Sequence, residues 1–501
     1  MSLVRIQSIM GNELSKRVFL SRPPEPPYEY LLNDPTDSIF IGTTKLFGVP
    51  FTWTYATLTN PHLAVVGITG AGKSFFVKTF LIRASYVWNT NAIIIDWAGE
   101  YKAWVRQSGG TVISLSKGDY INIMDLSGMK PIDRVKQIMN SLDILTDVSE
   151  YAEQRRLTSE AIEQAYVNAG FSLSQVPEPG SEAPTLKEVT ALLDEKLQDG
   201  SYEYPAELEN AIYRLRQFTR EGEDYFAKKS TIDIGKLSSS GLVALDLSTL
   251  PDEKFRALAA MFILQTLKER MRTEGWSGTK GLKAIVVLDE AWKVASDDRS
   301  DAITIVREGR KYQFGLIVAS QNPTDVNEAI FSNVGTTVML RIRFEKFMNY
   351  LQGSLNFSNY IRSEIGKFGV GQAAFDMSFH SAVQFPDVFL LERIVGEEPL
   401  DVYTINASDI LTPGELADQT IQKEYYLERI DLNSKFIQAG IGSEMIALLF
   451  ADLEKAGKTT SIQGLASIML KRGITKDTIV EFLRGMKIVD NVITRILSAA
   501  G

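Results

Sequence analysis

The 501-residue sequence contains no cysteine and only two histidines. The absence of cysteine excludes disulfide bonds and thiolate metal sites. Two histidines are too few for a histidine-based metal centre, and they argue against acid–base chemistry driven by histidine. We interpret His62 as structural, because it follows Pro61 directly before an apolar run, and we expect His380 to lie in a turn.

Long hydrophobic runs and an excess of basic residues are also missing. No stretch of about 18 apolar residues occurs, which predicts that the sequence has no membrane-spanning helix. The first residues lack the order of charged, apolar and small residues that marks a secretory signal. The net charge of −9 argues against a surface coated with basic residues for nucleic acid, although it leaves room for a local basic pore. The hydrophobic content of 45% is typical of a globular protein, and the length of 501 residues leaves room for roughly two or three domains.

Short apolar runs alternate with helical patterns over residues 46–395, which predicts an α/β domain built on a sheet. The candidate strands are 63–67, 92–96, 111–115, 242–246, 284–289, 315–320 and 337–341. From 131 to about 230 the pattern is helical and polar, so we expect an all-helical insertion. Residues 1–45 are interpreted as an extended arm with a short hairpin, and residues 396–501 as a helical C-terminal region.

The segment 67–74, with the sequence GITGAGKS, lies between an apolar run and a helical pattern. A strand, a glycine-rich loop ending in Lys-Ser and a helix form the context of a phosphate-binding P-loop, and a match at every position disfavours a chance glycine turn. Backbone N–H groups and the positive end of the helix would hold a polyphosphate. Lys73 would reach the β- and γ-phosphates, and the Ser74 hydroxyl would bind Mg²⁺. The residues expected to contact the nucleotide here are Gly67, Thr69, Gly70, Ala71, Gly72, Lys73, Ser74 and Phe75.

A second motif, Asp289-Glu290, follows four apolar residues of a candidate strand. Ligands bind at the carboxyl ends of strands in open α/β sheets. Asp289 would hold the magnesium ion, and Glu290 would polarise the attacking water as a general base. An exposed acidic turn is the alternative, but the upstream P-loop favours the catalytic interpretation. The pair predicts a hydrolase, since a nucleotide sensor needs only the aspartate.

Two further groups of polar residues stand beside these motifs. Gln321 ends the strand 315–320 and would sense the γ-phosphate or orient the water. Arg307 and Arg310 precede that strand and are candidates for an arginine finger in a neighbouring subunit's site, or for ion pairs on a solvated surface.

Asp96 ends another candidate strand and is followed by Gly99-Glu100. Both acids are candidates for the nucleotide site, because Asp96 would reach the magnesium ion or the water. A purely structural turn is equally compatible with this spacing.

Together these motifs resemble the HerA and type IV secretion ATPase family. The resemblance covers roughly residues 40–395 and includes Ile41-Gly42, Gly48–Pro50 and Asn60–His62. The longer matching segments are GITGAGKS at 67–74, IIIDWAGEY at 93–101, INIMDL at 121–126, VVLDEAWK at 286–293 and REGRKYQFGLIVASQNPTDV at 307–326. The helical insertion is similar to that of the conjugation-type members, which are called TraC in some plasmids.

The resemblance implies a RecA-like P-loop motor domain of the additional-strand, catalytic-glutamate type, which assembles as a homo-hexamer and hydrolyses ATP with Mg²⁺. The residues that match the family's Walker A, Walker B and sensor positions are Lys73 and Ser74, Asp289 and Glu290, and Gln321, respectively. Arg307 and Arg310 fall in the segment that resembles the arginine-finger motif, and the choice between them stays open.

Members of this family use ATP to move DNA or to power a membrane secretion channel. We therefore expect a motor that translocates DNA or drives its transfer or uptake across a membrane, and the layout is similar to that of archaeal DNA-import ATPases. One alternative is a secretion or pilus-assembly ATPase that acts on a membrane complex without gripping DNA. The other is a HerA-type end-resection helicase with a nuclease partner. We expect a cytoplasmic location, with the inner face of the membrane reached through a partner or a missing N-terminal segment.

The C-terminal region has one further pattern. Residues 462–479 faintly resemble a helix-turn-helix, but the spacing is long and Lys476 is the one basic residue early in the second helix. A structural or oligomer-packing role for these helices is therefore favoured over DNA reading.

Overall fold

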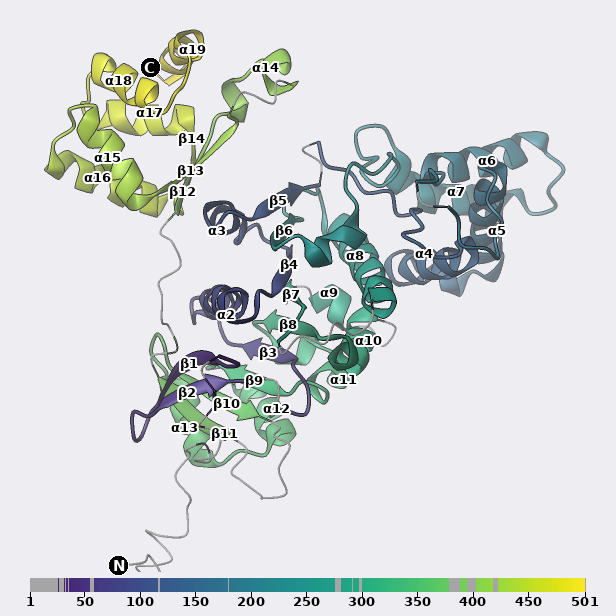
Figure 1. Cartoon of the computed structure of the whole chain (residues 1–501). Helices are drawn as coiled ribbons and strands as arrows, with labels where there is room; N and C mark the ends of the chain where they lie inside the picture. Colours follow the sequence, from purple (N-terminus) through teal and green to yellow (C-terminus); the bar gives the residue numbers. More distant parts are fainter. Residues whose placement is uncertain are drawn as a thin grey trace, which may run out of the picture. The chain divides into compact units, whose positions relative to one another are not determined.

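Figure 1 shows the computed structural model of the chain, which describes residues 26, 31, 33–34 and 36–500 apart from 55–57, 116–117, 179, 275–280, 291, 297–299, 378–387, 393, 395–401 and 418–421. The chain forms two compact units. The first comprises residues 1–100 and 112–397, and the second comprises residues 101–111 and 398–501. Most of the N-terminal arm and the turn expected at His380 lie outside the described residues.

The first unit is built on a sheet of eleven strands in the order β2-β1-β11-β10-β9-β3-β8-β7-β4-β6-β5. Neighbouring strands from β9 through β3, β8, β7 and β4 to β6 pair in parallel, whereas β2, β1, β11 and β10 add an antiparallel extension. The α/β prediction is therefore confirmed. The strands are β1 (Ile39–Thr44), β2 (Pro50–Trp53), β3 (Leu63–Val66), β4 (Asn91–Asp96), β5 (Thr111–Ser114), β6 (Leu242–Asp246), β7 (Ala284–Asp289), β8 (Phe314–Ser320), β9 (Thr336–Met339), β10 (Ala373–Met377) and β11 (Val388–Glu392).

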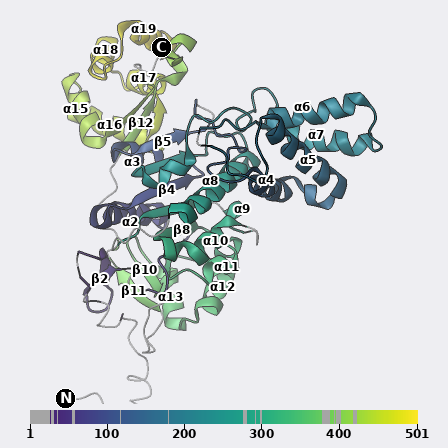
Figure 2. The same ribbon diagram turned by 45° about the vertical axis from the view of Figure 1, so that its right-hand side comes forward.

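The central parallel strands are apolar along nearly their whole length because helices cover both faces of the sheet. Every residue of β3, β7 and β8 is buried. Helix α2 (Lys73–Trp88) lies on one face and α10 (Asp301–Glu308) lies on the other, as Figures 1 and 2 show. Parallel strands end at one edge of the sheet, so the residues that follow β3, β4, β7 and β8 meet there.

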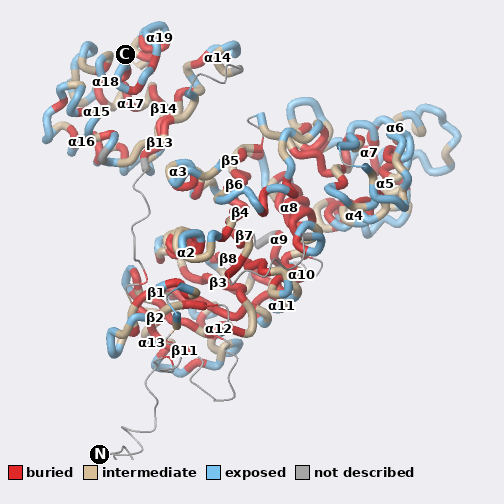
Figure 3. Tube along the Cα trace, in the orientation of Figure 1, coloured by how far each residue is buried: buried red, intermediate tan, exposed pale blue. Residues whose placement is uncertain are grey.

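Four helices form an insertion between β5 and β6 in the chain: α4 (Pro131–Thr146), α5 (Ala152–Asn168), α6 (Leu186–Asp199) and α7 (Pro205–Thr219). Each buries one stripe at helical spacing; in α7 this stripe is Leu208, Ala211, Ile212, Leu215 and Phe218. Their outer surfaces are exposed, whereas the sheet strands are buried (Figure 3). Helix α4 packs on α8 (Glu253–Glu274), which joins the insertion to the sheet domain.

The remaining helices of the first unit connect the strands or cover the antiparallel extension. They are α9 (Trp292–Ala295), α11 (Glu328–Phe331), α12 (Glu345–Leu355) and α13 (Asn359–Lys367). None of the helices in the described part of the chain combines the length and the apolar character that a bilayer-spanning segment needs.

The second unit contains the helices predicted at the C-terminus and a small sheet that was not predicted. The sheet has the order β13-β12-β14, formed by β12 (Val402–Asn406), β13 (Glu424–Glu428) and β14 (Thr459–Ser461). The helix α3 (Lys102–Gln107), which lies between β4 and β5 in the chain, packs on β12 and β13. The helices are α3 (Lys102–Gln107), α14 (Pro413–Ala417), α15 (Arg429–Gln438), α16 (Ser443–Lys455), α17 (Ile462–Lys471), α18 (Lys476–Gly485) and α19 (Asp490–Ala500).

The core of this unit is aromatic and aliphatic. Phe436 lies between Phe450 and Phe482, with ring centroids at 5.8 and 4.9 Å. Helices α17 and α18 are separated by four residues that include Gly473 at φ +81°, so two helices joined by a short turn are present where the helix-turn-helix resemblance lies.

Candidate nucleotide-binding site

The segment 67–74 joins β3 to the start of α2 as a tight loop. Gly70 and Gly72 adopt φ of +72° and +100°, a region that favours glycine. Gly67 has no room for a side chain, since a Cβ there would lie 2.9 Å from the Cβ of Leu340. Gly72 caps α2 without a side-chain hydrogen bond, and the first turn holds no acidic residue. The first N–H groups of α2 are therefore not capped by a side chain of the helix itself, which suits an anion.

Lys73, the first residue of α2, is buried at 7% exposure. Its Nζ donates to the main-chain oxygen of Gly67 at 3.1 Å and to that of Ile68 at 3.4 Å. Burial lowers the pKa of Lys73, while the charges of Asp289 and Glu290 oppose that shift. The ammonium group thus lies inside its own loop and close to both predicted acids, where phosphate oxygens would replace the loop carbonyls.

A chain of side-chain hydrogen bonds connects this loop to the Asp289-Glu290 motif. Strand β8 lies between β3 and β7, and Gln321 follows its last residue. The Thr69 hydroxyl donates to Gln321 Oε1 at 2.6 Å, and Gln321 Nε2 donates to Glu290 Oε1. The structure therefore brings the tip of the P-loop, the candidate sensor and the candidate base together at the edge of the sheet.

Glu290 has an unusual backbone conformation for a residue with a side chain. Its φ is +54°, and its N–H donates to the main-chain oxygen of Ala319 at 3.1 Å. A left-handed conformation of this kind costs roughly 1–3 kcal/mol, and such residues cluster at functional sites. The conformation turns the chain sharply at the end of β7 and leaves the carboxylate at Gln321.

Three aspartates end neighbouring parallel strands in the same register. Asp246 on β6 pairs with Asp96 on β4, which pairs with Asp289 on β7. All three are buried. Asp289 lies nearest the P-loop side of this row, because β7 is the strand that adjoins β8. The donor set of Asp289 and the Ser74 hydroxyl consists of oxygens, which fits Mg²⁺ better than metals that need imidazole or thiolate.

Asp96 itself closes the turn that carries Glu100. Its Oδ1 accepts hydrogen bonds from the N–H groups of Gly99 at 2.9 Å and Glu100 at 3.0 Å. The Glu100 carboxylate accepts from the Ser74 hydroxyl at 2.9 Å. Asp96 thus shapes the turn with one oxygen, while Glu100 reaches the P-loop serine directly.

Sequence reasoning missed Lys78, which also lies at this turn. Its Nζ donates to the main-chain oxygen of Glu100 at 3.0 Å. Burial lowers the pKa of Lys78, and the charges of Asp96, Glu100 and Asp289 oppose the shift. The available signal was its spacing, four residues after Ser74 and hence on the same side of α2.

The two candidate finger arginines lie in different surroundings. Arg310 is half-buried, and its Nη1 donates to the main-chain oxygen of Thr59 in the same chain. Arg307 is exposed in the last turn of α10 and makes no ion pair with any residue that the structure describes. Of the two, Arg307 is therefore the side chain available to a second subunit.

Ion pairs fasten both ends of α10, the helix that carries Arg307, to α8. At its start Asp301 Oδ1 lies 2.6 Å from Lys268 Nζ, and both side chains are largely buried. At its end Glu308 accepts two hydrogen bonds of 3.0 Å from Arg272. The Arg272 guanidinium lowers the pKa of the Glu308 carboxyl group.

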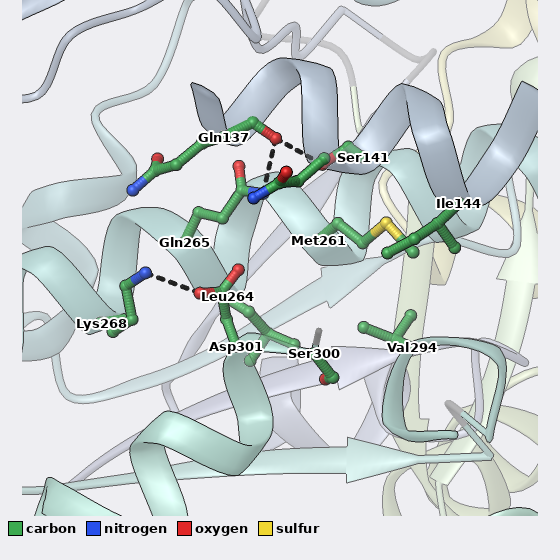
Figure 4. A pocket seen from close by; sticks show the side chains of 11 residues that line it. Gln137, Ser141, Ile144, Met261, Leu264, Gln265, Lys268, Val294, Ser300 and Asp301 are labelled. Atoms are coloured by element: carbon green, nitrogen blue, oxygen red, sulfur yellow. Dashed lines mark hydrogen bonds and ion pairs between the residues drawn. The ribbon is translucent and has the colours of Figure 1, made fainter. Parts of the chain in front are cut away.

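A small cavity lies between α4, α8 and the start of α10 (Figure 4). Gln265 spans one side of it by donating to Ser141 Oγ at 2.9 Å and to the main-chain oxygen of Gln137 at 3.2 Å. The cavity has a volume of about 60 Å³, which suits a few water molecules and is far too small for a nucleotide. This cavity is therefore part of the joint between the insertion and the sheet domain.

His62 is fully buried just before β3, in line with the structural interpretation. Its Nδ1 accepts a hydrogen bond from the Leu316 N–H at 3.0 Å, and its main-chain oxygen accepts from Gly335 and Thr336. Burial lowers the pKa of His62 to about 3. The neutral imidazole thus ties the start of β3 to β8, and the main-chain oxygen of His62 ties it to the start of β9.

Comparison with known proteins finds a family model that matches part of the chain, and relatives of low sequence identity. Residues 39–267 match the family described as "Helicase HerA, central domain". The chain is 26% identical over 392 residues to the DNA double-strand break repair helicase HerA of Pyrococcus furiosus. This alignment covers 67% of each protein. It is 23% identical over 385 residues to the DNA import protein CedB of Sulfolobus acidocaldarius, covering 72% of the chain but 59% of that protein.

Solved structures show the same fold at low sequence identity. VirB4 of Thermoanaerobacter pseudethanolicus superimposes with a TM-score of 0.57 and 21% identity, over 72% of this chain and 97% of that one. The bacterial conjugative coupling protein TrwB superimposes with a TM-score of 0.53 and 12% identity, over 73% of this chain and 90% of that one. The fold of this chain is therefore similar to the folds of VirB4 and TrwB.

Proposed function

Because residues 39–267 match the HerA central domain, we propose that the chain is a P-loop ATPase whose hydrolysis of ATP with Mg²⁺ drives the movement of DNA. The observation that carries the proposal is the hydrogen-bond chain from Thr69 through Gln321 to Glu290. It joins a phosphate-binding loop to a carboxylate that suits a general base, as hydrolysis requires.

In this proposal the loop N–H groups and Lys73 bind the triphosphate. Ser74 and Asp289 hold Mg²⁺, which when bound offsets negative charge on the phosphate oxygens. Glu290 accepts a proton from a water molecule and orients it for in-line attack on the γ-phosphate. Gln321 hydrogen-bonds to Glu290 and senses whether the γ-phosphate is present, because a phosphate at the loop competes for the Thr69 hydroxyl.

The active assembly in this proposal is a homo-hexamer with shared sites. Arg307 supports this view because it is exposed on α10, which packs on β8, the strand that Gln321 follows. An arginine inserted from a neighbour would stabilise charge on the transferring phosphoryl group. Arg310 is bound to Thr59 of its own chain and is the weaker candidate.

DNA is the proposed substrate of the motor. The two relatives described above are named a DNA double-strand break repair helicase and a DNA import protein, and the match to this chain spans about two thirds or less of their lengths. Transfer or uptake across a membrane, from a cytoplasmic position on a channel or pilus complex, is the function we favour. The HerA relatives favour a second candidate, a DNA end-resection helicase that works with a nuclease.

The test is the ATPase rate of the purified protein with and without single- and double-stranded DNA. A DNA-moving motor is expected to hydrolyse ATP faster with DNA, whereas a secretion ATPase that does not grip DNA would be unaffected. Unwinding of blunt duplexes, improved by a nuclease, would instead indicate the end-resection helicase. Absence of ATP hydrolysis under all conditions, including high protein concentration, would refute the proposal as a whole.

A further inference from the structure

Helix α2 contacts Glu100 from two successive turns. Ser74 Oγ donates to the Glu100 carboxylate at 2.9 Å, and Lys78 Nζ donates to the main-chain oxygen of Glu100 at 3.0 Å. Residues four apart lie on the same face of a helix. Lys78 therefore holds the backbone of the residue whose side chain reaches the P-loop serine.

The backbone conformation of the turn that ends in Glu100 is fixed by contacts within the turn and with Ser248. Asp96 Oδ1 accepts hydrogen bonds from the N–H groups of both Gly99 and Glu100. Gly99 adopts φ +79°, and a Cβ there would lie 2.7 Å from the Ser248 hydroxyl. Asp96 and Gly99 thus set the shape of the turn, and the contact from Lys78 sets where its last residue lies against α2.

The place where Glu100 is held is the place where a metal-nucleotide would need oxygen ligands. Ser74 is the candidate metal-binding hydroxyl, and Asp289 is level with Asp96 across the adjacent strand pair. A carboxylate just beyond the direct ligands can accept hydrogen bonds from water bound to the metal and can orient those waters. Magnesium keeps several waters when it binds to a protein with a nucleotide, so such an acceptor matters for its affinity.

We propose that Lys78 is a positioning residue that holds the Glu100 carboxylate beside Ser74, where it accepts hydrogen bonds from magnesium-bound water. The inference rests on the proposed ATPase function, gives the candidate residue Glu100 a role beside the metal, and adds Lys78 as its support. Lys78 acts through Glu100 and touches neither the nucleotide nor the metal.

A competing role for Lys78 makes the opposite prediction. Lys78 lies close to the carboxylates of Asp96, Glu100 and Asp289 and would act merely as their counter-charge. Removing a counter-charge makes the site more negative, so a divalent cation would then bind more tightly. Removing a positioning contact releases Glu100, so the cation would bind more weakly.

The experiment measures binding of a fluorescent ATP analogue, mant-ATP, during titration with Mg²⁺ and, separately, in EDTA. The variants are Lys78→Met, Lys78→Arg, Glu100→Gln and the Lys78→Met/Glu100→Gln double variant. Arg83→Met is the matched control, because it removes a cation from the same helix at a residue that contacts Phe40 instead of the turn. Thermal unfolding of each variant checks its folding, and Lys78→Arg keeps the test valid if Lys78→Met does not fold.

We expect the Mg²⁺ concentration at half-saturation to rise about ten- to a hundredfold in Lys78→Met and in Glu100→Gln, as for other residues that orient metal-bound water. Lys78→Arg should recover most of the loss, and Arg83→Met should match the wild type. The double variant should be no worse than Glu100→Gln alone, because both changes remove one interaction.

An unchanged or lower Mg²⁺ requirement in Lys78→Met would overturn the proposal, as would effects of the two single changes that simply add. Loss of mant-ATP affinity in EDTA to the same extent as in Mg²⁺ would also overturn it, because Lys78 would then act on the nucleotide itself. Failure of the wild type to bind mant-ATP in any condition would count against the proposed function instead.

Discussion

Acid should weaken the first unit through His62. Its imidazole is fully buried and its pKa is lowered by burial from 6.5 to about 3. Between these two values the unfolded chain binds a proton that the folded chain does not. The contribution of His62 to the free energy of unfolding is therefore complete above pH 6.5 and is lost as the pH falls toward 3.

The size of this effect follows from the two pKa values. Each pH unit below 6.5 lowers the free energy of unfolding by the equivalent of one pKa unit, which amounts to roughly 2 to 3 kcal/mol at pH 4.5. The reference is His62→Asn, whose Oδ1 can accept the hydrogen bond of the Leu316 N–H as the imidazole Nδ1 does. This variant is expected to be less stable at neutral pH, because it leaves a gap in the core.

The assay is urea unfolding of the wild type and His62→Asn, followed by tryptophan fluorescence at several pH values. The stability difference between the two proteins should shrink by about 2 kcal/mol from pH 6.5 to pH 4.5, because the His62 imidazole that takes up a proton on unfolding is present only in the wild type. A difference that stays constant over this range would refute the reasoning. NMR provides a second check, because a His62 ring signal that titrates near pH 6.5 in the folded protein would contradict its burial as a neutral group.

Three further predictions concern the nucleotide site. Glu290→Gln should bind ATP with near wild-type affinity but turn it over about 10²- to 10⁴-fold more slowly, and hydrolysis at the wild-type rate would exclude Glu290 as the base. Arg307→Ala should lose about 10³-fold or more in turnover yet regain activity when mixed with a Lys73→Ala variant, and a specific activity that stays constant on extensive dilution would contradict shared sites. Gly72→Ala should weaken mant-ATP binding and lower stability by about 1–2 kcal/mol, because its φ of +100° is strained for alanine; unchanged binding and stability would show that the loop adapts.

The sequence was most informative where a short motif or a continuous apolar run identifies an element by itself. The P-loop and the central strands could be predicted, because a buried parallel strand is a continuous apolar run and the loop has a fixed pattern of glycines. Strands β1, β2, β10 and β11 were not among the candidate strands. Their pairing joins distant parts of the chain, such as Thr43 with Glu392, and β1 contains polar residues and a glycine.

The internal contacts of the site depend on topology that no short motif contains. The link from Thr69 to Glu290 exists because β8 lies between β3 and β7, which only the assembled sheet determines. Lys78 was missed because α2 is mostly apolar and no motif includes this lysine. Its role depends on the contact with the turn at Glu100, which only the folded structure shows. The roles of the site residues stay predictions that the experiments above can test.

The fastening of α10 to α8 has a mechanical consequence. Helix α8 has 22 residues, which makes it roughly 33 Å long, and it contacts α4 of the insertion as well as α10. Because ion pairs hold α10 at both its ends, α10 has little scope to slide independently of α8. Because α4 and α10 both pack on α8, a displacement of the insertion by a bound partner would reach Arg307 through these helix contacts, in addition to any path through β8, on which α10 also packs.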